Sequence, residues 1–188
     1  IMRQDPDIIL VGEVRDKETA EMAFRAAMTG HQVFTTLHTN SALGAFPRLL
    51  DIGVGPDIMS GNIIGIIAQR LVRVLCTHCK EAYAPSQEER TLLGPMGQSV
   101  SFIYRPVGCK SCLSKGYRGR TPIMELLVMD GDMDELVARR ATAKELRAEA
   151  VSKGFRSLAE EGLSRVLDGS TSLSEVARTV DLTGRLRQ

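Results

Sequence analysis

The sequence DIILVGE, residues 7–13, is a short apolar run near the start of the chain. It does not alternate apolar and polar residues, which is typical of a strand buried on both faces of a parallel sheet. Asp16 suits the N-cap of a helix over residues 17–28, which Gly30 ends, and a second apolar strand follows over 32–38. A strand, a helix and a strand within about thirty residues predict an α/β unit with a parallel sheet.

Further elements are predicted along the rest of the chain. We expect a helix from residue 40 or 41 to 53, kinked or started late by Pro47, and a longer apolar helix over 57–74. Regular structure should be sparse over 76–112, a segment with many Pro and Gly breakers, and residues 120–129 are typical of a strand. After that strand we expect helices, because three residue pairs fit the capping-box spacing. These pairs are Thr142 with Glu145, Ser157 with Glu160, and Ser172 with Glu175.

The composition excludes several classes of protein. Hydrophobic residues make up 43% of the chain, which is enough for a core and argues against disorder of the whole chain. The formal net charge is +1 and aromatic residues make up 4%, whereas a nucleic-acid-binding zinc ribbon would be more basic and more aromatic, so we expect no nucleic-acid partner. The longest apolar run, near residues 63–68, is far shorter than the ~20 residues that cross a bilayer, so we expect no transmembrane segment.

All cysteines belong to two Cys-x-x-Cys pairs, Cys76 with Cys79 and Cys109 with Cys112. Four thiolates at these spacings can close a tetrahedral zinc site with zinc–sulfur distances of about 2.3 Å. The alternatives are two disulfides, four unrelated buried thiols, another metal or none; nothing in the sequence indicates secretion, and cytosolic thiols stay reduced. His78, inside the first pair, is a less favoured ligand. A closed site of four cysteines is structural, because no coordination position remains for water.

Polar side chains end both predicted strands. Glu13 follows four apolar residues and a glycine, as in a Walker B element, where a glutamate orients or deprotonates the water that attacks a γ-phosphate. His38 ends the second strand, so it should share a sheet edge with Glu13, where a histidine can hydrogen-bond a phosphate oxygen. His31 and Arg15 are weaker candidates for phosphate contacts. The alternatives are a solvated loop glutamate, hydrogen-bonded loop or core histidines, and an Arg15 that pairs with Asp16.

These segments, in this order, resemble the family of type II secretion and type IV pilus assembly ATPases. Residues 3–16 resemble the Walker B region of that family, and residues 29–40 resemble its histidine box. Residues 68–76 and 108–120 resemble the segments that lead into and close its tetracysteine zinc motif. The resemblance extends to about Thr179.

The resemblance implies a fold class and a division of the chain. The fold is expected to be α/β, a partial RecA-like P-loop NTPase core with parallel strands. Residues 1–75 are expected to form the C-terminal part of this core, with the Walker B segment and the histidine box. Residues 76–119 are expected to form a tetracysteine zinc-binding subdomain, and residues 120–188 a helical C-terminal region.

The resemblance also implies a function. Members of the family are hexameric ATPases at the cytoplasmic face of the bacterial inner membrane, peripheral to it, which use ATP and Mg²⁺ and act with the inner-membrane platform proteins of a secretion or pilus system. By resemblance, Glu13 is the catalytic glutamate and His38 the principal residue of the histidine box. Arg15 and His31 are nucleotide-binding candidates, and the four cysteines hold Zn²⁺.

One element of the family is absent from these 188 residues, namely a Gly-x-x-x-x-Gly-Lys-Ser/Thr loop, whose amides and lysine hold the phosphates. In the family it lies upstream of the Walker B strand. The chain also begins with Ile1 and enters a strand almost at once, so we expect a piece of a longer chain that does not hydrolyse ATP by itself. The alternative is a non-catalytic, zinc-stabilised interaction or assembly module on a degenerate ATPase scaffold, against which the presence of Glu13 and His38 argues.

Overall fold

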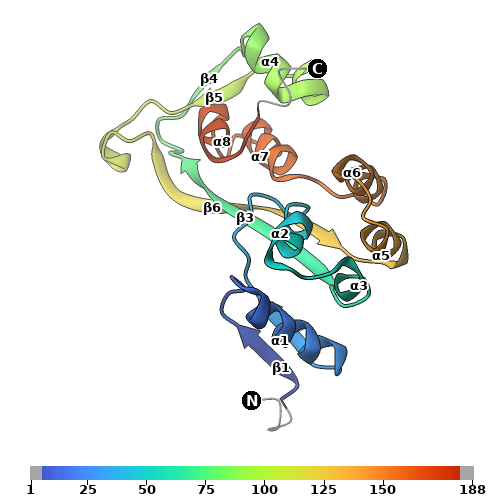
Figure 1. Ribbon diagram of the computed structural model, residues 1–188. Helices are drawn as coiled ribbons and strands as arrows, with labels where there is room; N and C mark the ends of the chain where they lie inside the picture. The colour runs from blue at the N-terminus through green and yellow to red at the C-terminus, as the bar shows by residue number, and fades with distance from the viewer. Residues whose placement is uncertain (1–5, 183–188) are drawn as a thin grey trace. The chain divides into compact units, whose positions relative to one another are not determined.

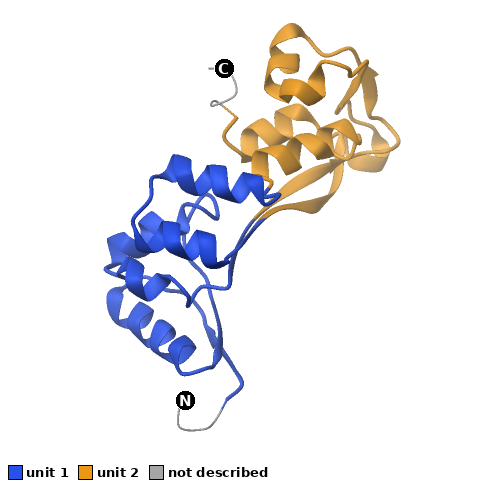
Figure 2. Cartoon of the chain, turned by 90° about the vertical axis from the view of Figure 1, so that its right-hand side faces the viewer, with its two compact units in different colours: residues 1–68, 126–155 blue, residues 69–125, 156–188 orange. Residues whose placement is uncertain are grey.

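The computed structural model describes residues 6–182, and they form two compact units (Figure 2). Unit 1 combines the segment up to Ala68 with Leu126–Phe155, and unit 2 combines Gln69–Glu125 with the segment from Arg156 onward. The three consecutive regions predicted from the sequence stay a prediction. Within residues 6–182, no helix has both the length and the apolar character needed to cross a membrane.

Unit 1 contains the predicted strand, helix and strand (Figure 1). These are β1 (Ile8–Val11), α1 (Lys17–Met28) and β2 (Gln32–Thr35), and the two strands pair in parallel. The Asp16 carboxylate caps α1 by accepting a hydrogen bond from the Thr19 N–H at 2.8 Å. The structure therefore confirms the α/β unit and its parallel pairing.

The other helices of unit 1 are α2 (Ala45–Ile52), α3 (Pro56–Met59), α5 (Gly131–Ala138) and α6 (Ala143–Ser152). The late start of α2 agrees with the expectation from Pro47, which lies in the first turn, where a missing N–H leaves no helical hydrogen bond unmade. In this unit α5 packs against α3 and α6.

The long helix predicted over residues 57–74 is wrong. Helix α3 is short, Gly61 then takes a left-handed φ of 73°, and Gly65–Leu75 form strand β3. This strand pairs with β6 (Tyr117–Val128) in a two-stranded sheet, so the predicted strand over 120–129 is confirmed. The Ile and Val residues of β3 favour an extended backbone, and pairing with a distant segment outweighed the helical interpretation that the length of the apolar run suggested.

Unit 2 contains more regular structure between the cysteine pairs than the sequence predicted. The antiparallel strands β4 (Glu81–Tyr83) and β5 (Ile103–Arg105) enclose α4 (Gln87–Leu93) and the 3₁₀ turn η2 (Gly94–Gly97). Helices α7 (Leu158–Leu167) and α8 (Leu173–Thr179) complete the unit. Its buried core consists of Leu93, Ile103, Leu163, Val166, Leu173, Val176 and Leu182.

The helices of the last segment begin largely as predicted. Helices α6 and α7 start with complete capping boxes. At α8 the Ser172 hydroxyl accepts a hydrogen bond from the Glu175 N–H at 3.2 Å, but the Glu175 carboxylate points into unit 2. There it accepts hydrogen bonds from Arg73 Nε at 2.9 Å and from Arg178 Nη2 at 2.8 Å. Burial alone would raise the pKa of Glu175, but the hydrogen bonds from Arg178 and Arg73 outweigh it and lower this pKa to about 2.

Replacing Glu175 with Gln should lower the free energy of unfolding by about 3 kcal/mol, because Arg73 loses a buried anionic partner. The folded-state pKa of about 2 lies below the ordinary 4.5, so the carboxylate stabilises fully above pH 4.5, and this stabilisation disappears as the pH falls toward 2. Urea denaturation across that pH range should show a smaller loss of stability in E175Q. The exposed Glu88, changed to Gln, is the matched control. Equal acid sensitivity of E175Q and the unmodified chain would contradict this assignment.

Candidate functional site

The parallel pairing of β1 and β2 brings two predicted site residues together. Because both strands run in the same direction, the residues that follow them meet at one edge of the sheet. Glu13 Oε1 lies 2.7 Å from His38 Nε2, and Glu13 Oε2 lies 2.5 Å from Arg15 Nη2. The carboxylate of Glu13 therefore lies between an imidazole and a guanidinium.

Hydrogen bonds beyond the strands hold this edge in place. The Thr36 hydroxyl donates to the Gly12 carbonyl at 2.6 Å, and the Val14 N–H donates to the Thr36 carbonyl at 3.0 Å. Val14 is buried and anchors the segment after Glu13. The backbone on both sides of Glu13 is thus attached to the segment that leads to His38.

The electrostatics of the edge keep Glu13 ionised. The hydrogen bond from Arg15 is the main cause that lowers the pKa of Glu13; partial burial opposes it, and the charges of Arg15, His38 and Arg48 add to the lowering. The side chain of Glu13 is 20% exposed, whereas those of Arg15 and His38 are exposed. Oxygen Oε1 has no contact with solvent; it lies against His38 Nε2 at 2.7 Å, in an orientation that is off the line of a regular hydrogen bond. An ionised carboxylate beside an exposed imidazole is suited to orient a water molecule or to accept its proton when the histidine side chain moves away from it.

His31 does not join this group. It precedes β2, at the opposite edge of the sheet from Glu13. Its Nδ1 lies 3.1 Å from the Ala26 carbonyl and 3.1 Å from the Thr29 hydroxyl, so its contacts are with the end of α1. Its predicted nucleotide contact stays a prediction. Arg15 pairs with Glu13 rather than with Asp16.

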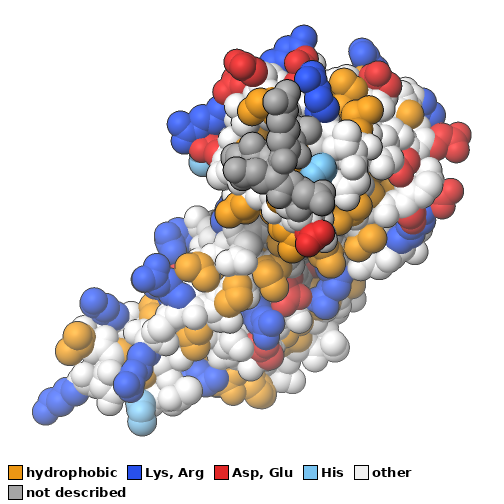
Figure 3. Space-filling model, turned by 90° about the horizontal axis from the view of Figure 1, so that it is seen from below, with side chains coloured by type: hydrophobic (Ala, Val, Ile, Leu, Met, Phe, Trp, Pro, Cys, Tyr) orange, Lys and Arg blue, Asp and Glu red, His pale blue; other side chains and the backbone are white. Residues whose placement is uncertain are grey.

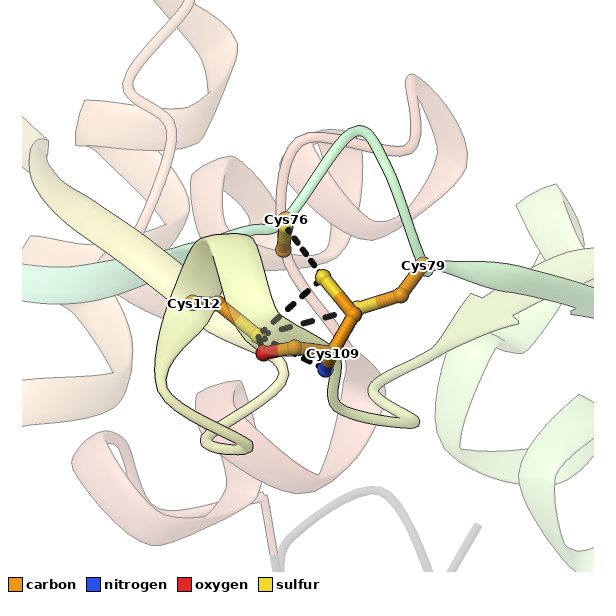
Figure 4. Close-up of side chains that lie close together, drawn as sticks. All are labelled: Cys76, Cys79, Cys109 and Cys112. Carbon is orange, nitrogen blue, oxygen red and sulfur yellow. Dashed lines mark hydrogen bonds between the residues drawn. The ribbon is translucent and has the colours of Figure 1, made fainter.

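The second candidate site is the cysteine cluster in unit 2, where four thiols from two turns point toward one another (Figure 4). Cys76 follows β3, Cys79 precedes β4, Cys109 precedes the 3₁₀ turn η3 (Lys110–Cys112), and Cys112 ends it. All four sulfurs lie within 4.8 Å of one another, and all four cysteines are free. This geometry contradicts the alternatives of two disulfides and of four unrelated thiols, and the exposed His78 is not a member of the cluster.

The spacing of the sulfurs fits a tetrahedral metal site. Four ligands at about 2.3 Å from a zinc ion lie about 3.8 Å from one another. The Cys79–Cys112 and Cys109–Cys112 sulfur pairs are 3.8 Å apart, and the Cys76–Cys109 pair is 4.0 Å apart. The residues present therefore fit the metal that their spacing in the sequence predicts.

Backbone N–H groups point at two of the sulfurs. Cys112 Sγ accepts from the N–H groups of Cys109 and Gly116, each at 3.2 Å, and Cys79 Sγ accepts from Gly108 at 3.3 Å. Burial opposes ionisation of Cys112, but its N–H donors outweigh burial and lower its pKa to about 6. Burial raises the pKa of Cys79 to about 11, and the neighbouring thiols add to this effect. The cluster thus already favours one thiolate.

The N–H donors are not apparent from the cysteine spacing, and Gly108 and Gly116 are the sequence signal for them. Gly108 has a φ of 113°, and a Cβ there would lie 2.7 Å from the Ser114 carbonyl oxygen. Gly116 has a φ of 73°, and a Cβ there would lie 2.5 Å from Pro106 Cβ. Only glycine allows the backbone to approach the cluster so closely at these positions.

Comparisons with known proteins identify relatives of the chain. Residues 1–178 match the family model described as Type II/IV secretion system protein. The chain is 47% identical over 178 residues to the Type II secretion system protein E of Pseudomonas aeruginosa, a match that covers 95% of this chain and 35% of that protein. It is 44% identical over 186 residues to the Type IV pilus assembly ATPase TfpB of Acinetobacter baylyi, which covers 97% of this chain and 32% of that protein. The chain spans about a third of the length of these curated relatives.

Solved structures share the fold. The X-ray structure of the Legionella pneumophila ATPase DotB superposes with a TM-score of 0.62 at 22% identity, over 94% of this chain and 39% of that chain. The Yersinia pseudotuberculosis ATPase DotB gives a TM-score of 0.63 at 21% identity, over 98% of this chain and 38% of that chain. At this identity the likeness concerns the fold alone.

Proposed function

The chain belongs to the Type II/IV secretion system protein family, and we propose that it is the C-terminal part of a hexameric ATPase that powers type II protein secretion or type IV pilus assembly. The relatives named above are a secretion protein and a pilus assembly ATPase. The observation that carries the proposal is the pairing of Glu13 with His38 at 2.7 Å, at the edge of the sheet where α/β proteins bind ligands.

In this proposal Glu13 and His38 act on the γ-phosphate of ATP. Glu13, ionised beside Arg15, accepts a hydrogen bond from the attacking water and orients it or takes its proton. The exposed His38 contacts a γ-phosphate oxygen through the imidazole that now faces Glu13. The Mg²⁺ that accompanies ATP would neutralise charge on the phosphates, and Glu13 is the acidic group of this edge that would face the nucleotide.

The exposed apolar residues of the strand pair support a larger RecA-like core. Parallel sheets are buried on both faces, yet Ile8, Leu10 and Phe34 of this pair are exposed. Hydrophobic side chains also reach the surface on the face drawn in Figure 3. We infer that β1 and β2 belong to a wider parallel sheet of a P-loop NTPase core.

The cysteine cluster is proposed to hold a structural Zn²⁺. Cys76, Cys79, Cys109 and Cys112 supply four sulfurs at tetrahedral spacing, and soft thiolates select zinc. With four protein ligands the metal has no open position for substrate, so its contribution is to hold the two turns together.

Location and partners follow from the family. We propose a cytoplasmic protein, peripheral to the bacterial inner membrane, that forms homohexamers and acts with inner-membrane platform proteins of the secretion or pilus system. The name of TfpB places that relative in pilus assembly, and protein E belongs by its name to a secretion system. We propose no nucleic-acid partner, given the net charge of +1.

A polypeptide of these 188 residues should show no measurable ATP hydrolysis and should bind nucleotide with about millimolar affinity at best, because it has no phosphate-binding Gly-x-x-x-x-Gly-Lys-Ser/Thr loop. Isothermal titration calorimetry with MgATP and a phosphate-release assay measure both quantities. Micromolar binding of MgATP by this polypeptide would overturn this assignment of the phosphate contacts.

A further inference from the structure

The second cysteine turn presents an apolar surface to solvent. Val107 is 58% exposed and Leu113 is 77% exposed, and they flank the turn that carries Cys109 and Cys112. In Figure 1 this segment projects at the left of the drawing, in olive. Two exposed lysines lie in the same segment. We call the exposed side chains of Val107, Lys110, Leu113 and Lys115 the knuckle surface.

The backbone of Leu113 is strained for a residue with a side chain. Leu113 has φ 52° and ψ 44°, and the next residue, Ser114, has a φ of 59°. Left-handed backbone is unfavourable for a leucine, and glycine would adopt it without this cost. Because its side chain is exposed, Leu113 recovers little of the cost by packing within unit 2. Hydrogen bonds of the turn hold this backbone, from the Ser114 N–H to the Cys109 carbonyl at 2.9 Å and from the Lys115 N–H to the Cys112 carbonyl at 3.1 Å, so the turn keeps the Leu113 side chain in solvent.

The charge around the knuckle surface has one sign. Residues 106–124 contain Lys110, Lys115, Arg118 and Arg120 but no Asp or Glu. Within residues 6–182, neither Lys110 nor Lys115 forms an ion pair, whereas Arg105, just before this segment, pairs with Glu81 at 2.9 Å. The knuckle surface therefore combines unpaired positive charge with exposed aliphatic side chains.

We propose that the knuckle surface docks a protein segment that is acidic and carries apolar side chains. The acidic groups of the partner would pair with Lys110 and Lys115, and its apolar side chains would cover Leu113 and Val107. Within one chain, two lysines and two aliphatic side chains are too few to attach a protein stably to an anionic membrane, and a patch that mixes charged and aliphatic side chains is typical of a protein interface, which favours a protein partner. This proposal rests on the proposed zinc site, which would hold the turn in place, and not on ATP hydrolysis.

The test is site-specific photo-crosslinking in the native host, with the complete protein. A photoreactive amino acid at Val107 should give a crosslink to one partner protein, in a peptide rich in Asp, Glu and apolar residues. The same amino acid at Val151, an exposed valine of α6, is the control and should not give this product. The double variant K110E/K115E should lower the yield about tenfold, and Lys substitutions at the acidic residues of the crosslinked peptide should restore it.

A second pair of variants separates binding from folding. Both L113G and S114G relieve left-handed backbone, so both should keep or raise the melting temperature and keep the zinc content. L113G removes the aliphatic contact and should lower the crosslink yield several-fold. S114G keeps Leu113 and should leave the yield unchanged.

Several results would overturn the proposal. They are the absence of a protein crosslink at Val107, a crosslink to a second copy of this chain, and a yield unaffected by K110E/K115E. Phosphatidylglycerol vesicles are the probe for a lipid ligand, and binding to them that K110E/K115E abolishes would assign the surface to the membrane instead. Zinc content and ATP hydrolysis, measured on the same variants, distinguish failure of this proposal from failure of the proposed function.

Discussion

Replacing Cys112 with Ser should abolish zinc binding and unfold the segment between the two cysteine pairs. A serine hydroxyl does not replace a thiolate ligand of Zn²⁺, and structural zinc sites contribute about 10–16 kcal/mol of apparent binding free energy in small domains. Cys112 has two roles in its turn, because its sulfur is a proposed metal ligand and also accepts hydrogen bonds from the N–H groups of Cys109 and Gly116. The strands β4 and β5 between the pairs are short and contain few residues to stabilise the segment alone.

The measurements are elemental analysis and hydrogen exchange. The unmodified, freshly reduced chain should contain one zinc ion per cluster, and C112S should contain none. Amide exchange should become fast over residues 76–116 in C112S or after chelation, and α1 with its two strands should stay protected, because these belong to unit 1. S111A is the matched control, since Ser111 is exposed and lies in the same turn. Freshly reduced protein without zinc would contradict the site.

The cysteine site was predictable because covalent spacing dictates most of its geometry. Two residues between the cysteines of a pair place both sulfurs on one side of a tight turn, whatever the rest of the fold does. The donors of Gly108 and Gly116 were not predictable, because they depend on positive φ values and on how closely Ser114 and Pro106 approach the backbone. Local spacing therefore determines which residues form the cluster, and tertiary packing determines how their charge is stabilised.

The same difference between local and long-range interactions explains which elements of the fold could be predicted. Helix α1 follows from its cap and its terminal glycine, which act over a few residues. Strand β3 was mistaken for helix because its partner β6 lies more than 40 residues further along the chain, and the apolar run itself has helical length. Pairing between distant segments leaves little trace in the local pattern of either segment.

The sheet edge with Glu13 and His38 could be predicted only in part. Parallel pairing of β1 and β2 predicted that the two residues meet, and the distance of 2.7 Å agrees with it. The position of Arg15 on the second carboxylate oxygen depends on the path of the loop after β1, which the strand pattern does not specify. His31 shares a sequence motif with His38 but lies at the other edge, because a strand separates them.

In the proposed complete ATPase, Glu13→Gln should lower the rate of hydrolysis about a hundredfold to ten-thousandfold and leave ATP binding intact. The carboxamide keeps the shape of the side chain but cannot take a proton from the attacking water, and a positioned general base contributes about 10²–10⁴-fold. It also removes the negative charge that faces Arg15 and His38. Phosphate release at saturating MgATP measures the rate, and calorimetry measures binding. The exposed Glu18 in the first turn of α1, changed to Gln, is the matched control and should keep full activity.

The pH dependence adds a second test of the same residue. Because Arg15 holds the pKa of Glu13 below its ordinary value of 4.5, the carboxylate stays ionised as the pH falls to the ordinary range of glutamate. If Glu13 is the base, the acid limb of the pH–rate profile lies below that pH range in the unmodified enzyme. In R15A, which lacks the guanidinium, this limb should move to higher pH. Retained turnover in E13Q would remove Glu13 from catalysis. If E13Q lost both ATP binding and turnover, Glu13 would instead be assigned to holding the nucleotide. An acid limb at the same pH in R15A and in the unmodified enzyme would show that Arg15 does not lower the pKa of Glu13.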